Sequence, residues 1–309
     1  MRRPTGLTRV AAIDCGTNSL RLLVADLSRA GLFDVARRME IVRLGEGVDR
    51  TGEFSPEALE RTRVVLADYA RELRDLGASR VRMVATSASR DVTNRAAFRT
   101  IVEQTLGAEP EVITGDEEAR LSFLGATQHL PGVQTPYLVV DIGGGSTEFV
   151  LGKSTVDSAV SVDIGCVRLT ERHLHSDPPA AAEVDAAVGD IRAGLALAAE
   201  TVPMDRARTL LGLAGSVTTV AALALGLPAY DRAEIHHARI GYQQVAEVTA
   251  MLLRATRSER AALPVLHPGR VDVIGAGALV LRTVMQLTGA DSVLASEHDI
   301  LDGIAYSLG

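Results

Sequence analysis

The chain has 309 residues, of which 47% are hydrophobic and 23% charged, and a formal net charge of −7. This is a globular composition for about two domains, and its acidic balance argues against general nucleic-acid binding. The apolar runs are too short for a transmembrane helix, and no secretory signal follows the basic N-terminus. Two cysteines, Cys15 and Cys166, give no disulfide framework, so a cytoplasmic protein is expected.

The first predicted element is a β-hairpin over residues 10–24. An apolar run ends at Asp14, a turn of small residues follows from Gly16 to Ser19, and a second apolar run then begins. Two strand-like runs around a turn of this kind are typical of a hairpin. Taken alone, this hairpin is weak evidence for any function.

A helix and a strand are predicted next. Ser55 is placed to cap a helix with Pro56 at its first position, and the helical spacing of apolar residues lasts until Gly77. Residues 80–85 alternate as a strand does, and small hydroxyl residues follow, which can line a ligand site at a strand end. Arg90, at the next turn, either pairs with Asp91 on the surface or reaches a phosphate chain.

Residues 114–121 predict a helix start with two adjacent acids. Thr114 and Glu117 have the spacing of a capping box, in which the Glu carboxylate binds the N-cap backbone. This explains Glu117 structurally. Glu118 needs no such explanation, although acids at helix starts are common because they complement the helix dipole. On local sequence alone, Glu118 is more easily read as structural.

The stretch from Tyr137 to Leu151 predicts a second hairpin. An apolar run ends at Asp141, three glycines and Ser146 follow, and Glu148 opens the next apolar run. Glycines let successive N–H groups point into one concavity, which suits phosphate oxygens, and carboxylates suit Mg²⁺. The pattern therefore favours a phosphate-plus-metal loop, although an ordinary Gly-rich hairpin with solvated acids is the alternative.

The two hairpins indicate a duplication. Asp14, Gly16 and Ser19 match residues of the second hairpin at a constant offset of 127 residues, namely Asp141, Gly143 and Ser146. The stretch 212–220, which contains Gly215 and Ser216, also resembles residues 86–94 at a similar offset. Two such pairs, half a chain apart, suggest two related domains that each present a phosphate loop.

The remaining elements lie in the second half. Residues 165–168 can start a helix, residues 180–199 predict a surface helix, and residues 271–281 predict a tightly packed helix. Ser296 is placed to cap a last helix, with Asp299 at its third position. His236 and His237 are adjacent in a loop-like region and are assigned no role.

These motifs resemble the exopolyphosphatase/guanosine pentaphosphate phosphatase (Ppx/GppA) family over nearly the whole chain. Residues 14–19 and 141–148 are similar to its two phosphate loops, and residues 117–121 carry its Glu-Glu-Ala-Arg block. Further blocks occur in the family order at residues 86–91, 215–219 and 270–277. Cys15 stands where Ile is more usual, and residues 296–303 are less basic than in many members.

The resemblance implies an α/β, actin-like (ASKHA) fold with two ribonuclease-H-like domains around a cleft. It places domain I at residues 1–123 and domain II at residues 124–297, with a C-terminal helix at 298–309 packing back on domain I. The chain looks like a short two-domain member. A homodimer is compatible with the family.

The resemblance also assigns roles to individual residues. It makes Glu118 the catalytic base and Arg90 a stabiliser of negative charge. The metal, Mg²⁺ with Mn²⁺ as a substitute, would be held by carboxylates: Asp141, Glu148 and Asp14. The phosphates would be held by residues of the Gly-rich and hydroxyl turns: Asn18, Ser19, Gly143, Gly144, Gly145, Ser146, Gly215 and Ser216.

The function implied is exopolyphosphatase, which hydrolyses the terminal phosphoanhydride of inorganic polyphosphate and releases orthophosphate. The shortness of the chain suggests a preference for short polyphosphates. The same chemistry would serve a pppGpp 5′-phosphatase, and the motifs do not separate these two substrates. A third alternative, an actin-like nucleotide-binding scaffold without hydrolysis, is disfavoured by the Glu-Glu-Ala-Arg block. No membrane partner is expected.

Overall fold

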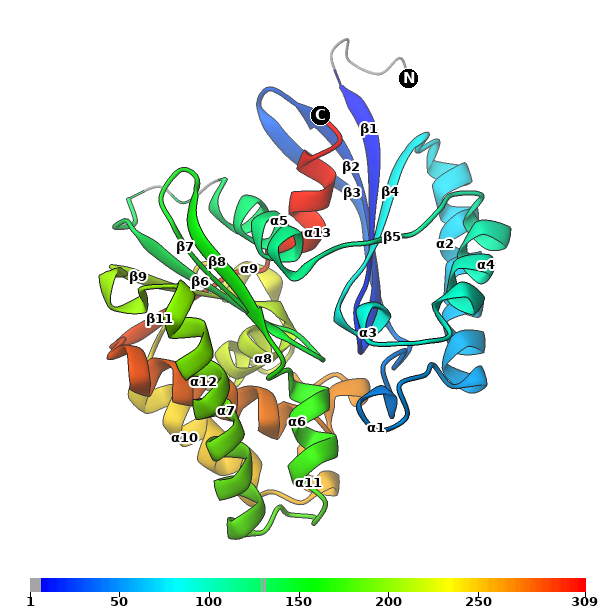
Figure 1. Ribbon diagram of the computed structural model, residues 1–309. Coiled ribbons are helices and arrows are strands. Elements are labelled where there is room, and N and C mark those ends of the chain that lie inside the picture. The colour runs from blue at the N-terminus through cyan, green and yellow to red at the C-terminus, as the bar shows by residue number, and fades with distance from the viewer. Residues whose placement is uncertain (1–6, 129, 131) are drawn as a thin grey trace. The chain divides into compact units, whose positions relative to one another are not determined.

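The computed structural model of the protein describes residues 7–128, 130 and 132–309, so most of the basic N-terminus lies outside it. The chain divides into two compact units. Unit 1 contains the residues up to Gln128 together with Ile300–Gly309, and unit 2 contains the residues between them, up to Asp299. Each unit is built on its own β-sheet (Figure 1).

The sheet of unit 1 has five strands in the order β3-β2-β1-β4-β5. Its first three strands form an antiparallel meander, and β4 and β5 extend it in parallel from β1. The first predicted hairpin is therefore confirmed. The strands are β1 (Thr8–Cys15), β2 (Ser19–Ser28), β3 (Gly31–Ile41), β4 (Arg80–Ala85) and β5 (Glu111–Val112).

Both faces of this sheet are covered by helices. Strand β1 sends Ala11 and Ile13 to one apolar core and Val10 and Ala12 to the other, because successive side chains point to opposite faces. The first core includes α2 and α4, and the second includes α5 and α13 (Figure 1). The helices are α1 (Val48–Thr51), α2 (Pro56–Leu76), α3 (Ser87–Arg90), α4 (Arg95–Leu106), α5 (Gly115–Thr127) and α13 (Ile300–Tyr306).

The predicted ends of α2 are confirmed. Ser55 accepts a hydrogen bond from the Ala58 backbone N–H, Pro56 is the first helical residue, and Gly77 ends the helix in a left-handed conformation. The predicted starting residue of the last helix is wrong. Helix α13 begins at Ile300, whereas Ser296 forms a local turn in which its hydroxyl donates to the His298 carbonyl.

The sheet of unit 2 repeats this topology and adds one strand, in the order β10-β11-β9-β6-β7-β8. Its antiparallel meander β6-β7-β8 and its parallel strands β9 and β11 correspond to β1-β2-β3, β4 and β5 of unit 1. The second predicted hairpin is also confirmed. The strands are β6 (Tyr137–Ile142), β7 (Thr147–Gly152), β8 (Val156–Val162), β9 (Thr209–Leu213), β10 (Arg239–Gly241) and β11 (Ser292–Ala295).

The helices of unit 2 surround one large apolar core. Helix α12 contributes almost its whole length to this core, because it is apolar on all sides. The helices are α6 (Cys166–His173), α7 (Ala181–Thr201), α8 (Ala214–Ala224), α9 (Arg232–Ile235), α10 (Tyr242–Arg254), α11 (Arg257–Ala261) and α12 (Ile274–Thr288). Short 3₁₀ turns lie at Met204–Arg206 and Pro268–Arg270.

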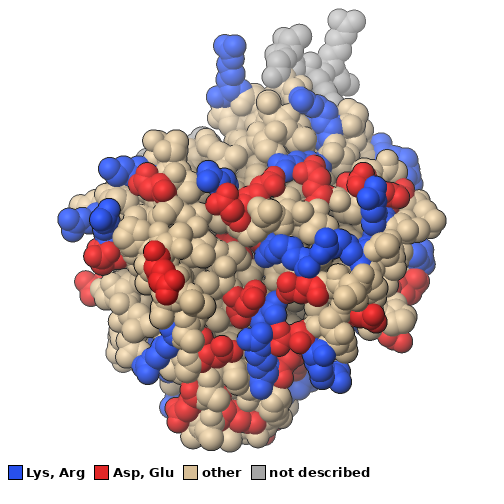
Figure 2. All heavy atoms as spheres, in the orientation of Figure 1, with Lys and Arg blue, Asp and Glu red and all other residues tan. Residues whose placement is uncertain are grey.

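The surface mixes charges of both signs. Figure 2 shows Lys and Arg interspersed with Asp and Glu over the face in view. Several arginines pair with acids one helical turn away, as Arg63 does with Glu60 at 2.7 Å. Within the described residues, no helix combines the length and the apolar character needed to cross a membrane.

Helices α5 and α13 cross closely at a glycine. A Cβ atom on Gly303 would lie 1.9 Å from the Leu121 backbone oxygen, which belongs to α5. Atoms cannot approach so closely, and the obstacle is backbone rather than a side chain that can rotate away. Only glycine therefore lets the two helices pack at this distance.

Replacing Gly303 with alanine is expected to destabilise unit 1 by about 1–3 kcal/mol, because α13 must move off α5. The matched control is Gly189→Ala on α7, where an added Cβ meets nothing within 4 Å. That change should be neutral or stabilising, since alanine favours helices. Urea unfolding of both variants measures the difference, and equal midpoints would contradict the close crossing.

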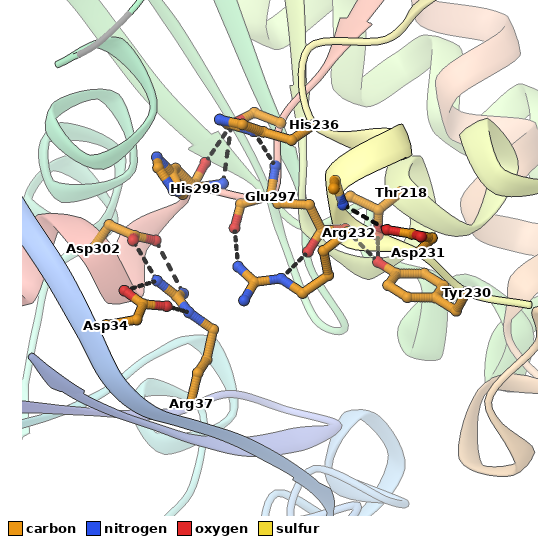
Figure 3. A network of polar contacts seen from close by, with 12 residues as sticks. Asp34, Arg37, Thr218, Tyr230, Asp231, Arg232, His236, Glu297, His298 and Asp302 are labelled. Atoms are coloured by element: carbon orange, nitrogen blue, oxygen red, sulfur yellow. Dashed lines mark hydrogen bonds and ion pairs between the residues drawn. The ribbon is translucent and has the colours of Figure 1, made fainter.

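A polar network holds the segment that leads from β11 to α13 (Figure 3). Glu297 accepts hydrogen bonds from the Tyr230 hydroxyl and, at 2.9 Å, from Arg232 Nε. Its backbone N–H donates to His236 Nδ1 at 3.1 Å. The His236 ring also stacks on His237, with centroids 3.7 Å apart, and contacts His298 at 4.4 Å.

The histidine cluster predicts lower stability in acid. Burial, followed by the neighbouring His298, lowers the pKa of His237 from its ordinary value of 6.5. The unfolded chain therefore binds this proton more readily, and stability falls as the pH drops below about 6.5. His237 also has a positive φ of 65°, which asparagine tolerates. The unfolding temperature of His237→Asn should fall less than that of wild type when the pH is lowered from about 7.5 to about 5.5. An equal fall in both proteins would contradict this assignment.

Candidate active site

Each unit presents a four-residue turn at the same place in its sheet. In unit 1 the Gly16 N–H donates to the Ser19 carbonyl at 3.0 Å, and in unit 2 the Gly143 N–H donates to the Ser146 carbonyl at 3.0 Å. Each turn follows the carboxyl end of a strand whose parallel neighbour ends beside it, at Ala85 or at Leu213. Ligands commonly bind at such strand ends in α/β sheets.

The start of α6 binds the carbonyl groups of the turn in unit 2. The Cys166 N–H donates to the Gly143 carbonyl at 2.9 Å, and the Val167 N–H donates to the Gly144 carbonyl at 2.8 Å. In a planar trans peptide the N–H points opposite to the carbonyl. The N–H groups of Gly144 and Gly145 therefore point away from α6, as an anion-binding concavity requires.

This arrangement needs a glycine at position 165. A Cβ atom there would lie 2.3 Å from backbone atoms of Gly144 and 2.4 Å from the Gly145 carbonyl carbon. The Gly165 N–H also donates to the Gly145 carbonyl at 3.2 Å. The loop and the helix start are therefore packed backbone against backbone.

Two buried carboxylates lie opposite each other beside this turn. Asp141 on β6 pairs in register with Glu148 on β7, so both side chains project from the same face of the sheet. Asp141 is 6% exposed and Glu148 is 2% exposed. Glu148 Oε1 accepts hydrogen bonds of 2.7 Å from the hydroxyls of Ser146 and Ser161. Like charges placed opposite each other in this way repel, which a cation would relieve.

The corresponding pair in unit 1 is already neutralised. Asp14 on β1 lies opposite Arg21 on β2, and the Arg21 guanidinium approaches Asp14 Oδ2 at 2.6 and 2.8 Å. Arg21 occupies the position that Glu148 holds in unit 2. The duplicated hairpins therefore differ in charge, and the geometry favours unit 2 for a metal ion.

Gly215 and Ser216, at the start of α8, follow Leu213, which pairs with Asp141 next to the glycine turn. The Arg270 guanidinium covers Gly215, where a Cβ would lie 2.0 Å from Arg270 Cζ. Ser216 packs against Gly277 of α12 and hydrogen-bonds to the Cys166 side chain. Burial raises the pKa of the Cys166 thiol, and the bond with Ser216 partly offsets this rise.

The turn in unit 1 is held by the segment after β3. The Asn18 carbonyl accepts from the Val42 and Arg43 N–H groups, at 3.1 and 2.9 Å. The Thr17 carbonyl accepts from the Gly45 N–H at 2.8 Å. The next N–H groups, on Asn18 and Ser19, therefore point away from this segment. The resemblance to the family implies that both residues bind phosphate.

Glu118 and Arg90 form a close ion pair in unit 1. Arg90 Nη1 approaches Glu118 Oε2 at 2.7 Å and donates to the Ile113 carbonyl at 3.2 Å. Glu118 is only 8% exposed. Arg90 is thus engaged with Glu118, which lies far from it in sequence. The pairing joins the end of α3 to the first turn of α5.

The capping-box prediction for α5 is half correct. The Thr114 hydroxyl accepts from the Glu117 N–H at 3.2 Å, as predicted. The Glu117 carboxylate instead accepts from Arg82 Nη2 at 2.6 Å. Glu117 and Glu118 are thus fixed by different arginines, and of the two only Glu118 is buried.

Sequence reasoning assigned no role to the residues that hold the two turns, each within its own unit, or that contact their neighbours. These include α6 with Arg168, the segment 42–45, Ser161 and the guanidinium of Arg270. Residues 165–168 predict the start of α6 from the sequence. No local pattern indicated that its N–H groups bind the glycine turn.

Two similar α/β units, each with a four-residue turn at the end of its first strand, define an actin-like protein. The chain belongs to the Ppx/GppA phosphatase family, whose model matches residues 23–308. The predictions of family and of an actin-like fold are confirmed.

Related proteins match this chain over nearly its whole length. It is 55% identical to Exopolyphosphatase 2 of Mycobacterium tuberculosis, covering 98% of this chain and 99% of that protein. It is 29% identical to the guanosine-5′-triphosphate,3′-diphosphate pyrophosphatase of Photobacterium profundum, covering 96% of this chain but 59% of that protein. A crystal structure of an exopolyphosphatase-like protein superposes with a TM-score of 0.95 at 43% identity, covering 98% and 99% of the two chains.

Proposed function

We propose that this protein is an exopolyphosphatase that hydrolyses the terminal phosphoanhydride of inorganic polyphosphate. The observation that carries this proposal is the buried pair Asp141 and Glu148 beside a glycine turn whose N–H groups face away from α6. The likeness to an exopolyphosphatase over nearly its full length supports the choice of substrate. Hydrolysis requires a positioned water, neutralised phosphate charge and a held leaving group.

A divalent cation fits the donor set of unit 2. Two carboxylates side by side offer hard oxygen ligands, and Mg²⁺ commonly uses one or two carboxylates together with substrate phosphates. We therefore assign Mg²⁺, with Mn²⁺ as a substitute, to Asp141 and Glu148, and Asp14 is the weaker candidate because Arg21 neutralises it. When bound, the ion would neutralise phosphate charge and polarise the scissile group. Ser146 and Ser161 orient Glu148 toward this role.

The phosphates would be bound mainly by backbone groups. In unit 2 these are the N–H groups of Gly144, Gly145 and Ser146, together with the start of α8 at Gly215 and Ser216, while the Gly143 N–H closes the turn by donating to the Ser146 carbonyl. In unit 1, Asn18 and Ser19 offer the corresponding N–H groups. Backbone donors held from behind need no reorganisation when negative charge develops, which favours the transition state.

Glu118 is the proposed general base. Its carboxylate is buried and held at Oε2 by Arg90, so its orientation is fixed before substrate binds. Glu118 would accept a proton from the attacking water as the new P–O bond forms and the bridging P–O bond of the phosphoanhydride breaks, with the shortened polyphosphate as the leaving group. Arg90 positions Glu118 and brings a guanidinium charge to the reaction, which suits the developing negative charge.

The decisive experiment measures phosphate release from polyphosphates of defined length, pppGpp and ATP in parallel, with Mg²⁺. We expect polyphosphate to be hydrolysed with the highest kcat/KM and activity to disappear on chelation and return with Mg²⁺ or Mn²⁺. Faster phosphate release from pppGpp would favour the alternative substrate. The name of the Photobacterium profundum relative, guanosine-5′-triphosphate,3′-diphosphate pyrophosphatase, is consistent with that alternative. Nucleotide binding without any phosphate release would instead support the third alternative, a scaffold without hydrolysis.

The proposal includes a cytoplasmic location, which follows from two cysteines without a disulfide framework, and a homodimer, which is compatible with the family. Neither depends on the chemistry of the site. Sedimentation of the purified protein would determine the oligomeric state, and fractionation of the producing cell would determine the compartment.

A further inference from the structure

One peptide of the glycine turn is held by a side chain. The Gly143 and Gly144 carbonyls are bound by backbone N–H groups of α6, which no substitution other than proline removes. The Gly145 carbonyl instead accepts its shorter bond, 2.8 Å, from Arg168 Nε, in addition to 3.2 Å from the Gly165 N–H. Among these three carbonyls, Gly145 is the one whose orientation depends on a side chain.

The Gly145–Ser146 peptide links the two roles proposed for unit 2, which are phosphate binding and metal binding. Because the peptide is planar and trans, fixing the Gly145 carbonyl also fixes the direction of the Ser146 N–H, which points the opposite way. The same residue uses its hydroxyl to bind Glu148 at 2.7 Å. A rotation of the Gly145–Ser146 peptide would therefore disturb a phosphate donor and a metal-ligand contact together.

Arg168 is built into this position. It lies in the first turn of α6, its side chain is 11% exposed, and its own N–H donates to the Gly144 carbonyl at 3.2 Å. A further ionic contact, with Asp163, is 3.7 Å long and involves a side chain that is 68% exposed, so that pair contributes little. The guanidinium Nε is bound to the turn.

We propose that Arg168 is a positioning residue that aims the Ser146 N–H at the terminal phosphate. The proposal rests on the proposed function for the use of polyphosphate, but not for the binding of phosphate itself. Arg168 need not touch substrate, because it acts through the Gly145 carbonyl.

The test compares Arg168→Met, which removes the donor, with Arg168→Gln, whose amide can donate to the carbonyl. The matched control is Arg172→Met, one helical turn later, where Arg172 pairs with Asp190 at 3.2 Å and is 34% exposed. We expect Arg168→Met to lower kcat/KM for polyphosphate and to weaken inorganic phosphate binding by about tenfold or more, since it removes a charged donor. Arg168→Gln should recover part of the loss, and Arg172→Met should match wild type.

A second measurement uses the wild-type protein and needs no variant to fold. Adding inorganic phosphate with Mg²⁺ should shift the amide resonance of Ser146. An unmoved Ser146 resonance, or wild-type phosphate affinity in a folded Arg168→Met variant, would overturn the proposal. Failure of polyphosphate hydrolysis in wild type would instead refute the proposed function, while the phosphate-binding measurements would still decide the role of Arg168.

Discussion

Replacing Glu118 with glutamine should lower kcat for phosphate release by about 10²–10⁴-fold, the usual contribution of a single general base. Glutamine keeps the size of the side chain and can still accept from Arg90 Nη1, so the ion pair becomes a hydrogen bond and the helix start is preserved. It cannot take a proton from water. The loss should therefore fall on kcat, with KM little changed.

The chain provides a control one residue away. Glu117 begins the same helix and also binds an arginine, but it pairs with Arg82 and its side chain is 44% exposed. Glu117→Gln should release phosphate at close to the wild-type rate. Near-normal turnover by Glu118→Gln would remove Glu118 from the mechanism, and equal losses in both variants would indicate a structural effect on α5.

Replacing Glu148 with glutamine should raise the Mg²⁺ concentration needed for half-maximal activity by about 10–100-fold, the scale on which metal sites respond to loss of supporting groups. The variant then offers one carboxylate at this position in place of two. Titration of the rate with Mg²⁺ and calorimetric titration with Mn²⁺ measure this change.

The direction in which Glu148→Gln changes the unfolding temperature distinguishes a metal ligand from an acid with a structural role. Without metal, Glu148→Gln should unfold at or above the wild-type temperature, because it relieves the repulsion across the hairpin. With Mg²⁺, wild type should gain more stability than the variant, since bound ligand stabilises the folded state. Asp157→Asn, an exposed acid on β8, serves as the control and should change neither property. Equal stabilisation of both proteins by Mg²⁺ would exclude Glu148 as a ligand.

The sequence was most informative where a pattern is local. The two hairpins follow from apolar runs around glycine turns, and the ends of α2 follow from Ser55, Pro56 and Gly77. The offset of 127 residues between Asp14 and Asp141 anticipated the matching strand orders of the two sheets. These features depend on neighbours in the chain, and short-range chemistry determines them.

Long-range pairings could not be predicted. Arg90 has an acid beside it in sequence, Asp91, yet it binds Glu118 from another helix. Glu117 has the spacing of a capping box, yet Arg82 on β4 takes its carboxylate. In both cases the choice of partner depends on which elements the fold brings together. The role of each predicted site residue and the domain ranges 1–123 and 124–297 stay predictions.

The position of α13 has a consequence for how the molecule is made. This helix supplies Ile300, Leu301 and Ile304 to the core that also contains β1 residues from the beginning of the chain. A ribosome adds residues in order, so the face of the first sheet that α13 covers is shielded only in part, by α5, while all of unit 2 is synthesised. During that interval the nascent chain exposes apolar surface of the kind that chaperones bind. The part of the protein that is made first is therefore the last to be completed.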